Sequence, residues 1–208
     1  MSFPEPYRAR PARPDDLDSL VELFEARDAV DVGFVDPVRD EILGDWALPR
    51  FEFERDTVIA EAPDGSVAAY GVVLVNDPSV QILTLGKVHP DHSGLGLGNA
   101  LVAEAERRAA ALLSPGVAAP LRSIVPATAQ PAVDMVLAQG YRHVRSAWIM
   151  QRGLPADDVQ ASLPRGFTLR LGTVEDQPVA HQVLDEAFRE HFGYEPWTFD
   201  EWRSGYQG

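Results

Sequence analysis

The stretch HPDHSGLGLGNALV, residues 89 to 102, places glycines at positions 94, 96 and 98 between two periodic segments. A β-branched run, residues 80 to 88, precedes it, and residues 97 to 113 carry apolar side chains at helical spacing. Glycine tolerates positive φ and lets amides approach a ligand, and the first amides of a helix lack intrahelical partners. The pattern predicts a strand, a bare loop and a helix whose N-terminus suits a diphosphate. The alternative is a glycine turn that only allows packing.

Two common nucleotide-binding motifs do not fit this loop. A P-loop ends in Gly-Lys-Ser or Gly-Lys-Thr, whereas Asn99 and Ala100 follow Gly98. A Rossmann fingerprint requires its third glycine where Asn99 stands, and an acidic residue after the following strand. The loop therefore belongs to neither class.

The rest of the pattern predicts a mixed α/β fold. Three strand-like runs, residues 57 to 62, 67 to 75 and 80 to 88, are joined by short turns and should pair antiparallel. A helix separates the third run from a strand at 121 to 127, which should make that pair parallel. We also expect an extended segment at 7 to 10, helices starting near Pro14 and Pro37, a helix ending at Gly140, and strand material at 141 to 154.

Composition limits the partners. A formal charge of −14 argues against a nucleic-acid-binding face and favours a cationic substrate. No run of 18 apolar residues and no apolar signal region occur, so we expect neither a membrane span nor an export signal and a cytoplasmic location. Cysteine is absent, which excludes disulfides and thiolate catalysis. We expect no metal site, because His143, His181 and His191 lack ligand spacing.

The chain divides into three expected parts: a domain over 1–153, a linker over 154–165, and the opening of a second, incomplete copy over 166–208. The segment from Phe167 aligns with that from Tyr7 at an offset of 160 residues, so that Arg170 matches Arg10. Chance similarity between two strand-and-helix openings is the alternative. A true repeat makes the chain the front of a longer tandem protein or a cleavage product.

The stretch VHPDHSGLGLGNALV resembles motif A of the GNAT superfamily, the acyl-CoA-dependent N-acyltransferases. Their signature R/QxxGxG/A maps onto SGLGLG, Ser93 to Gly98. The resemblance covers Tyr7 to Gly153 and implies a mostly antiparallel sheet with a splayed parallel pair and flanking helices. The whole chain resembles the N-terminal copy of tandem, mycothiol synthase-like members, followed by the start of a second copy.

The resemblance also implies a cofactor, acetyl-CoA, and roles for particular residues. Lys87, Val88 and His89 would lie along the pantetheine and thioester, with the Val88 N–H polarising the acyl carbonyl. The diphosphate would be held by Gly94, Leu95, Gly96, Leu97, Gly98 and Asn99. Amine attack on the thioester also needs a base for the ammonium and an acid for the thiolate.

Three positions depart from the family pattern. Ser93 stands where the signature has Arg or Gln, and Leu95 replaces a frequent basic residue, so the loop lacks charge-assisted phosphate contacts. Val136 occupies the position at which many members carry the tyrosine acid. His89 is a candidate base, with a loop or packing role as the alternative, and Tyr141 is an alternative acid or a packing aromatic.

Two functions follow from these observations. The first is an N-acetyltransferase acting on a small-molecule amine, and the second is a catalytically eroded half that binds CoA weakly or serves as a scaffold. Seven of the 18 aromatic residues lie between Phe188 and Tyr206. We expect these rings to pack on the first domain or on another copy of the chain.

Overall fold

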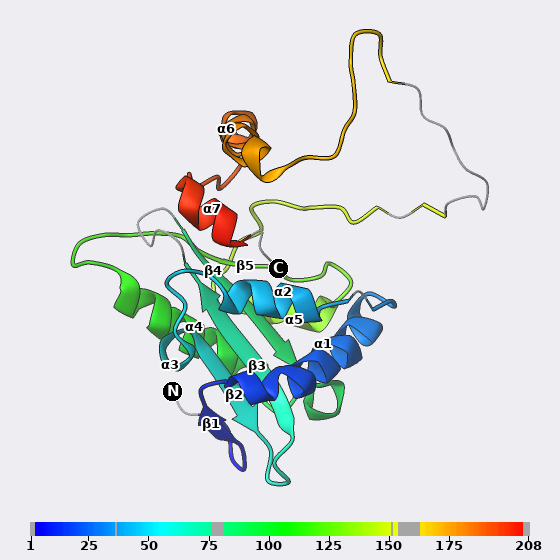
Figure 1. Ribbon diagram of the computed structural model, residues 1–208. Coiled ribbons are helices and arrows are strands. Elements are labelled where there is room, and N and C mark those ends of the chain that lie inside the picture. The colour runs from blue at the N-terminus through cyan, green and yellow to red at the C-terminus, as the bar shows by residue number, and fades with distance from the viewer. Residues whose placement is uncertain (1–2, 36, 76–80, 151, 154–162, 206–208) are drawn as a thin grey trace.

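The computed structural model describes residues 3–35, 37–75, 81–150, 152–153 and 163–205. One five-stranded sheet organises the first part of the chain, with its strands side by side in sequence order (Figure 1). The strands are β1 (Arg8–Arg10), β2 (Thr57–Glu61), β3 (Val67–Leu74), β4 (Ile82–Val88) and β5 (Leu121–Ser123). The first four pair antiparallel, and β5 runs parallel to β4, as the sequence predicts.

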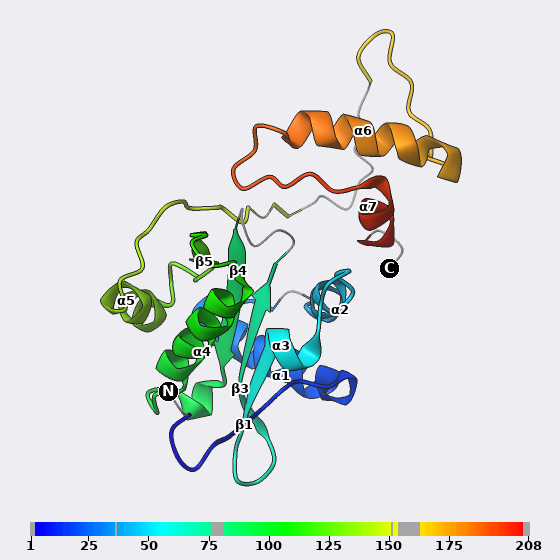
Figure 2. The same ribbon diagram turned by 90° about the vertical axis from the view of Figure 1, so that its left-hand side faces the viewer.

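Helices cover both faces of the sheet. The structure contains α1 (Leu17–Asp31), α2 (Arg39–Trp46), α3 (Phe53–Asp56), α4 (Leu97–Leu112), α5 (Gln130–Ala138), α6 (Gln177–Phe188) and α7 (Phe199–Gly205), with 3-10 turns η1 (Pro14–Asp16), η2 (Pro90–His92) and η3 (Val174–Asp176). Helices α1 and α2 lie on one face and α4 on the other (Figure 2). No described helix is long and apolar enough to cross a membrane.

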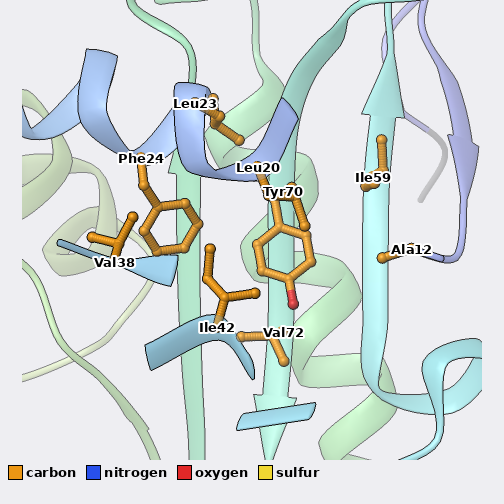
Figure 3. Close-up of a cluster of buried hydrophobic side chains, with 9 residues drawn as sticks. All are labelled: Ala12, Leu20, Leu23, Phe24, Val38, Ile42, Ile59, Tyr70 and Val72. Atoms are coloured by element: carbon orange, nitrogen blue, oxygen red, sulfur yellow. The ribbon is translucent and has the colours of Figure 1, made fainter. Parts of the chain in front are cut away.

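Alternating strand residues build the two halves of the core. On the α1 and α2 face, the rings of Phe24 and Tyr70 lie among buried aliphatic side chains (Figure 3). On the other face, Val58 and Ala69 pack against Leu97 and Leu101 of α4. The two-residue period of β2 and β3 therefore sorts side chains between the helix layers.

Helix α4 lies close to the sheet because two strand residues opposite it are glycines. A Cβ on Gly71 would lie 3.0 Å from Leu101 Cδ2, and one on Gly86 would lie 3.4 Å from Leu101 Cδ1. Leu101 thus fills the space above the adjacent strands β3 and β4. This contact holds α4 against β4, with the glycine loop connecting the end of β4 to the start of α4.

Some strand predictions are wrong in extent. Strand β5 ends at Ser123 rather than at residue 127, close to Pro126, which has no N–H to donate. Residues 141 to 150, predicted as strand, form none, and Trp148 and Met150 are 85% and 90% exposed. A three-residue β5 offers too short an edge to pair with them. The predicted strand end at 151 and 154, and linker residues 154–162, lie outside the described residues.

The two aligned openings have the same local structure. Arg10 donates from both terminal nitrogens to Asp16, at 2.8 and 2.7 Å, and Arg170 does the same to Asp176, at 2.6 Å for each bond. Turns η1 and η3, and the starts of α1 and α6, are all offset by 160 residues. Of the two openings, the first contains a strand, whereas the described residues 167 to 171 are exposed and form no strand.

Residues between α6 and α7 contact the sheet of the first part. The ring of Phe192 lies 4.4 Å from the Arg122 guanidinium and 5.1 Å from that of Arg145. Gln81 Nε2 donates to the Gly193 carbonyl at 2.8 Å. These contacts support the expected docking of the aromatic segment, which stays a prediction; Tyr206 lies outside the described residues.

Candidate functional site

The glycine loop brings an open helix N-terminus to the surface. Gly94 and Gly96 have φ angles of +77° and +85°, and Gly96 is the N-cap of α4. No side chain caps α4, and its first turn contains no acidic residue. Amides from Gly94 to Asn99 donate no backbone hydrogen bond to another described residue. These features fit a site for an anionic group.

Gly98 allows a second helix to approach the same loop. A Cβ on Gly98 would lie 2.8 Å from the Met135 sulfur of α5. Gln139, at the end of α5, donates to Asn99 Oδ1 at 2.8 Å. The third glycine therefore serves the packing of α5 beside the N-terminus of α4.

Strands β4 and β5 separate beside this loop. They pair only from Ile82 to Thr84, so the last residues of β4 have β3 as their only strand neighbour in the described chain. His89 donates its N–H to the Ala68 carbonyl at 2.9 Å. Because antiparallel residues alternate in bonding direction, the N–H groups of Gly86 and Val88 point away from β3. They face the edge of β4 beyond Thr84 that β5 leaves unpaired, which we call the opening.

The side chains flanking Val88 have partners within the chain. Lys87 forms an ion pair with Asp28 of α1, and its Nζ lies 5.3 Å from the centre of the Phe24 ring. His89 accepts a hydrogen bond at Nδ1 from the Asp91 amide at 3.3 Å, within η2. The predicted roles of Lys87 and His89 toward a ligand stay predictions.

Two contacts at this site are not visible as sequence motifs. Tyr7, which precedes β1, bonds through its hydroxyl to His92 Nδ1 at 2.8 Å. Arg27 of α1 reaches Ser93 Oγ, with its Nη1 at 3.3 Å. The partners are 85 and 66 residues apart in the chain, so no local spacing could have revealed them.

Residues near α5 offer little acid chemistry at the loop. Val136 lies within α5 and carries no proton to donate. The Tyr141 hydroxyl is buried near Glu106, and burial, with the Glu106 carboxylate, raises its pKa to about 12. Glu106 lies nine residues after Leu97, about 14 Å along α4, so Tyr141 flanks the middle of the helix.

On the opposite face of the sheet, α2 carries a carboxyl group with a perturbed pKa. Burial, with repulsion from Glu41, raises the pKa of Asp45 to about 6. Burial also raises the pKa of Tyr70, whose hydroxyl accepts a hydrogen bond from Trp46 Nε1 at 3.3 Å. Sequence reasoning did not single out Asp45, because its pKa depends on tertiary burial.

A splayed strand pair, a glycine loop and an uncapped helix N-terminus are features of the GNAT fold, and comparison with known proteins agrees. The chain is 33% identical over 214 residues to a mycothiol acetyltransferase of Salinispora arenicola, with 98% of the chain covered. A GCN5-related N-acetyltransferase from Sphaerobacter thermophilus superimposes with a TM-score of 0.73 and 29% identity over 98% of the chain. The chain belongs to the GNAT superfamily, as its motif predicts.

More distant structures share the fold alone. A phosphinothricin acetyltransferase from Sinorhizobium meliloti, solved with AcCoA, is 20% identical with a TM-score of 0.50, over 64% of the chain and 74% of its own. No family model matches the chain. The chain spans 64% of the length of each of the Salinispora and Sphaerobacter proteins.

Proposed function

We propose that the chain provides the donor site of an N-acetyltransferase, which transfers an acetyl group from acetyl-CoA to a small-molecule amine. The observation that carries this proposal is the convergence of outward-directed amides at one end of the sheet. Val88 and Gly86 direct their N–H groups into the opening beside β4, and the loop from Gly94 to Asn99 presents its amides next to it. The amides of β4 match the thioester arm of acetyl-CoA, and those of the loop match its diphosphate.

In the proposed reaction, the amine nitrogen attacks the thioester carbonyl carbon, the C–S bond breaks, and the thiolate takes up a proton. The Val88 N–H donates to the carbonyl oxygen as negative charge develops there. His89, next along the chain, is the candidate base for the ammonium proton. An imidazole ring is the side chain that most often serves as a general base in proteins.

A second candidate is a catalytically eroded half that binds CoA weakly or acts as a structural module. Strand β4 contains no acidic residue, and Val136 replaces the tyrosine acid of the family pattern. Lys87, the only lysine, is already paired with Asp28. With these features, the chain keeps the backbone amides that would bind CoA but lacks side chains that would transfer protons.

We further propose that residues 166–208 begin a second copy of the fold. The matched Arg-Asp pairs of the two openings, offset by 160 residues, support this. The exposed side chains of Phe167, Leu169 and Leu171, 71% to 92% exposed, fit a strand whose partners belong to that copy. We also propose a cytoplasmic location, as the sequence predicts.

Calorimetric titration of the 208-residue chain with acetyl-CoA tests the donor site, and a thiol-release assay with small amines tests transfer. The name of the Salinispora relative makes an amine precursor of mycothiol one acceptor to include. Sub-millimolar binding with amine-dependent thiol release supports the enzyme. Binding without release supports the eroded half, and absence of binding contradicts both CoA-binding proposals.

A further inference from the structure

We propose that Arg27 of α1 supplies the positive charge that the glycine loop lacks, by donating from Nη1 to the diphosphate of CoA. This inference rests on the proposed acyl-CoA site. Residues 93 to 99, SGLGLGN, contain no charged side chain. Among the lysines and arginines that the structure describes, only Arg27 has a side chain bonded to this segment, through Ser93 Oγ at 3.3 Å.

The orientation of Arg27 is fixed by Asp31, one helical turn further along α1. Nε donates to Asp31 Oδ2 at 2.8 Å, and Nη2 pairs with Oδ1. The Arg27 and Asp31 side chains are 20% and 8% exposed, so this fork lies at the surface layer rather than in free solvent. A guanidinium has five N–H donors, and the fork leaves those of Nη1 directed toward the loop. Asp31 is therefore a positioning residue.

The small side chain of Ser93 makes this arrangement feasible. Ser93 directly precedes Gly94, so Nη1 contacts the residue that leads into the loop. A phosphate oxygen there can accept both from the loop amides and from Nη1. A charge-assisted hydrogen bond is about twice as strong as a neutral one, so the remote arginine replaces the contact that a cation at position 93 would make.

Other charged groups around the loop are engaged elsewhere or lie outside it. Lys87 is paired with Asp28, and the His92 ring is bonded to Tyr7. Asp91 is the acidic residue closest to the loop in sequence, and its side chain is 85% exposed. The net charge beside the loop therefore depends on Arg27 and on the Asp31 carboxylate that holds it.

The test measures CoA affinity by calorimetry for the full chain and its variants. We expect Arg27→Gln to weaken CoA binding about tenfold, the loss of one charged hydrogen bond. The double variant Arg27→Gln with Asp31→Asn removes both charges and should show a similar loss. Arg107→Gln, an exposed arginine in the last turns of α4, is the matched control and should bind as the parent does. Adding Ser93→Arg to the double variant should restore affinity.

Each other outcome overturns the inference. Parental affinity in the double variant would mean that Arg27 only neutralises Asp31. An effect of Arg27→Gln that disappears with 3′-dephospho-CoA would assign the contact to the 3′-phosphate instead. Unchanged affinity in Arg27→Gln, in a chain that binds CoA, would refute the role of Arg27 alone. If the parent binds no CoA, the donor-site proposal fails together with this one.

Discussion

Replacement of Val88 by proline tests the direction of its amide. Proline lacks an N–H and is tolerated in a strand only where that group faces away from the ladder. In β4 the bonding alternates, so Lys87 and His89 donate to β3 while Val88 points into the opening. Val88→Pro should therefore keep the fold but lose the donor contact, whereas Lys87→Pro should damage the sheet.

The expected magnitudes separate the two variants. Val88 is partly buried against the core cluster that contains Leu97 and Leu101, so a smaller apolar ring there costs about 1 kcal/mol of stability. Lys87→Pro removes a ladder bond and leaves the Tyr70 carbonyl unpaired, which together cost about 2 to 4 kcal/mol. Loss of an oxyanion donor at Val88 would lower the rate of acetyl transfer by about 10² to 10³.

Urea unfolding gives the stability of both variants, and calorimetry with acetyl-CoA and thiol release give binding and transfer. We expect a stable Val88→Pro protein with weakened acetyl-CoA binding. A Val88→Pro chain as unstable as Lys87→Pro would refute the outward direction of the Val88 amide, since this amide would then lie within the ladder. Parental binding and transfer in Val88→Pro would refute the donor role.

Three further predictions concern the loop and two carboxyl groups. Gly96→Ala and Gly65→Ala, at φ +85° and +87°, should each lose about 1 to 2 kcal/mol in urea unfolding, but only Gly96→Ala should weaken CoA binding. Hydrogen bonds from Arg107 and Arg108, opposed by burial, lower the pKa of Glu104 to about 2. Ionised Glu104 therefore stabilises the fold fully above its unfolded pKa, and this stabilisation is lost as pH falls from about 4 toward 2. Glu104→Gln should flatten that part of a urea-unfolding pH profile. Asp45, with a pKa of about 6, destabilises the fold when ionised, so Asp45→Asn should raise stability at pH 8 and lose this advantage below about pH 4.

Each of these has a contradicting result. Equal loss of CoA binding in Gly65→Ala would show that the effect is general instability. A Glu104→Gln profile that keeps the parental slope between pH 4 and 2 would remove Glu104 as its cause. Asp45→Asn that is no more stable at pH 8 would mean that its carboxylate is well solvated.

Local patterns predicted the central sheet well. The Val- and Ile-rich runs between residues 57 and 88 and the short turns that join them specify strands β2, β3 and β4 and their antiparallel order. The helix between the third and fourth runs specifies the parallel β4 and β5 pair. The glycine loop could be placed because its spacing, the strand before it and the helix after it are all local signals.

Features that depend on distant partners could not be predicted. Strand β5 is short because Pro126 follows it and because residues 141 to 150 form no strand beside it. The apolar residues within 141 to 150 had predicted such a strand. The contacts of Arg27 with Ser93 and of Lys87 with Asp28 join residues 66 and 59 positions apart. Strand alternation does carry one overlooked signal: Ile82 packs against α4, so Lys87 must face α1.

The most direct test of the donor site is an amide NMR titration of the chain with acetyl-CoA. We expect the largest chemical-shift changes at Gly86, Val88 and the loop from Gly94 to Asn99, because these amides gain acceptors on binding. A saturating titration that shifts other amides and leaves these unchanged would contradict the donor site.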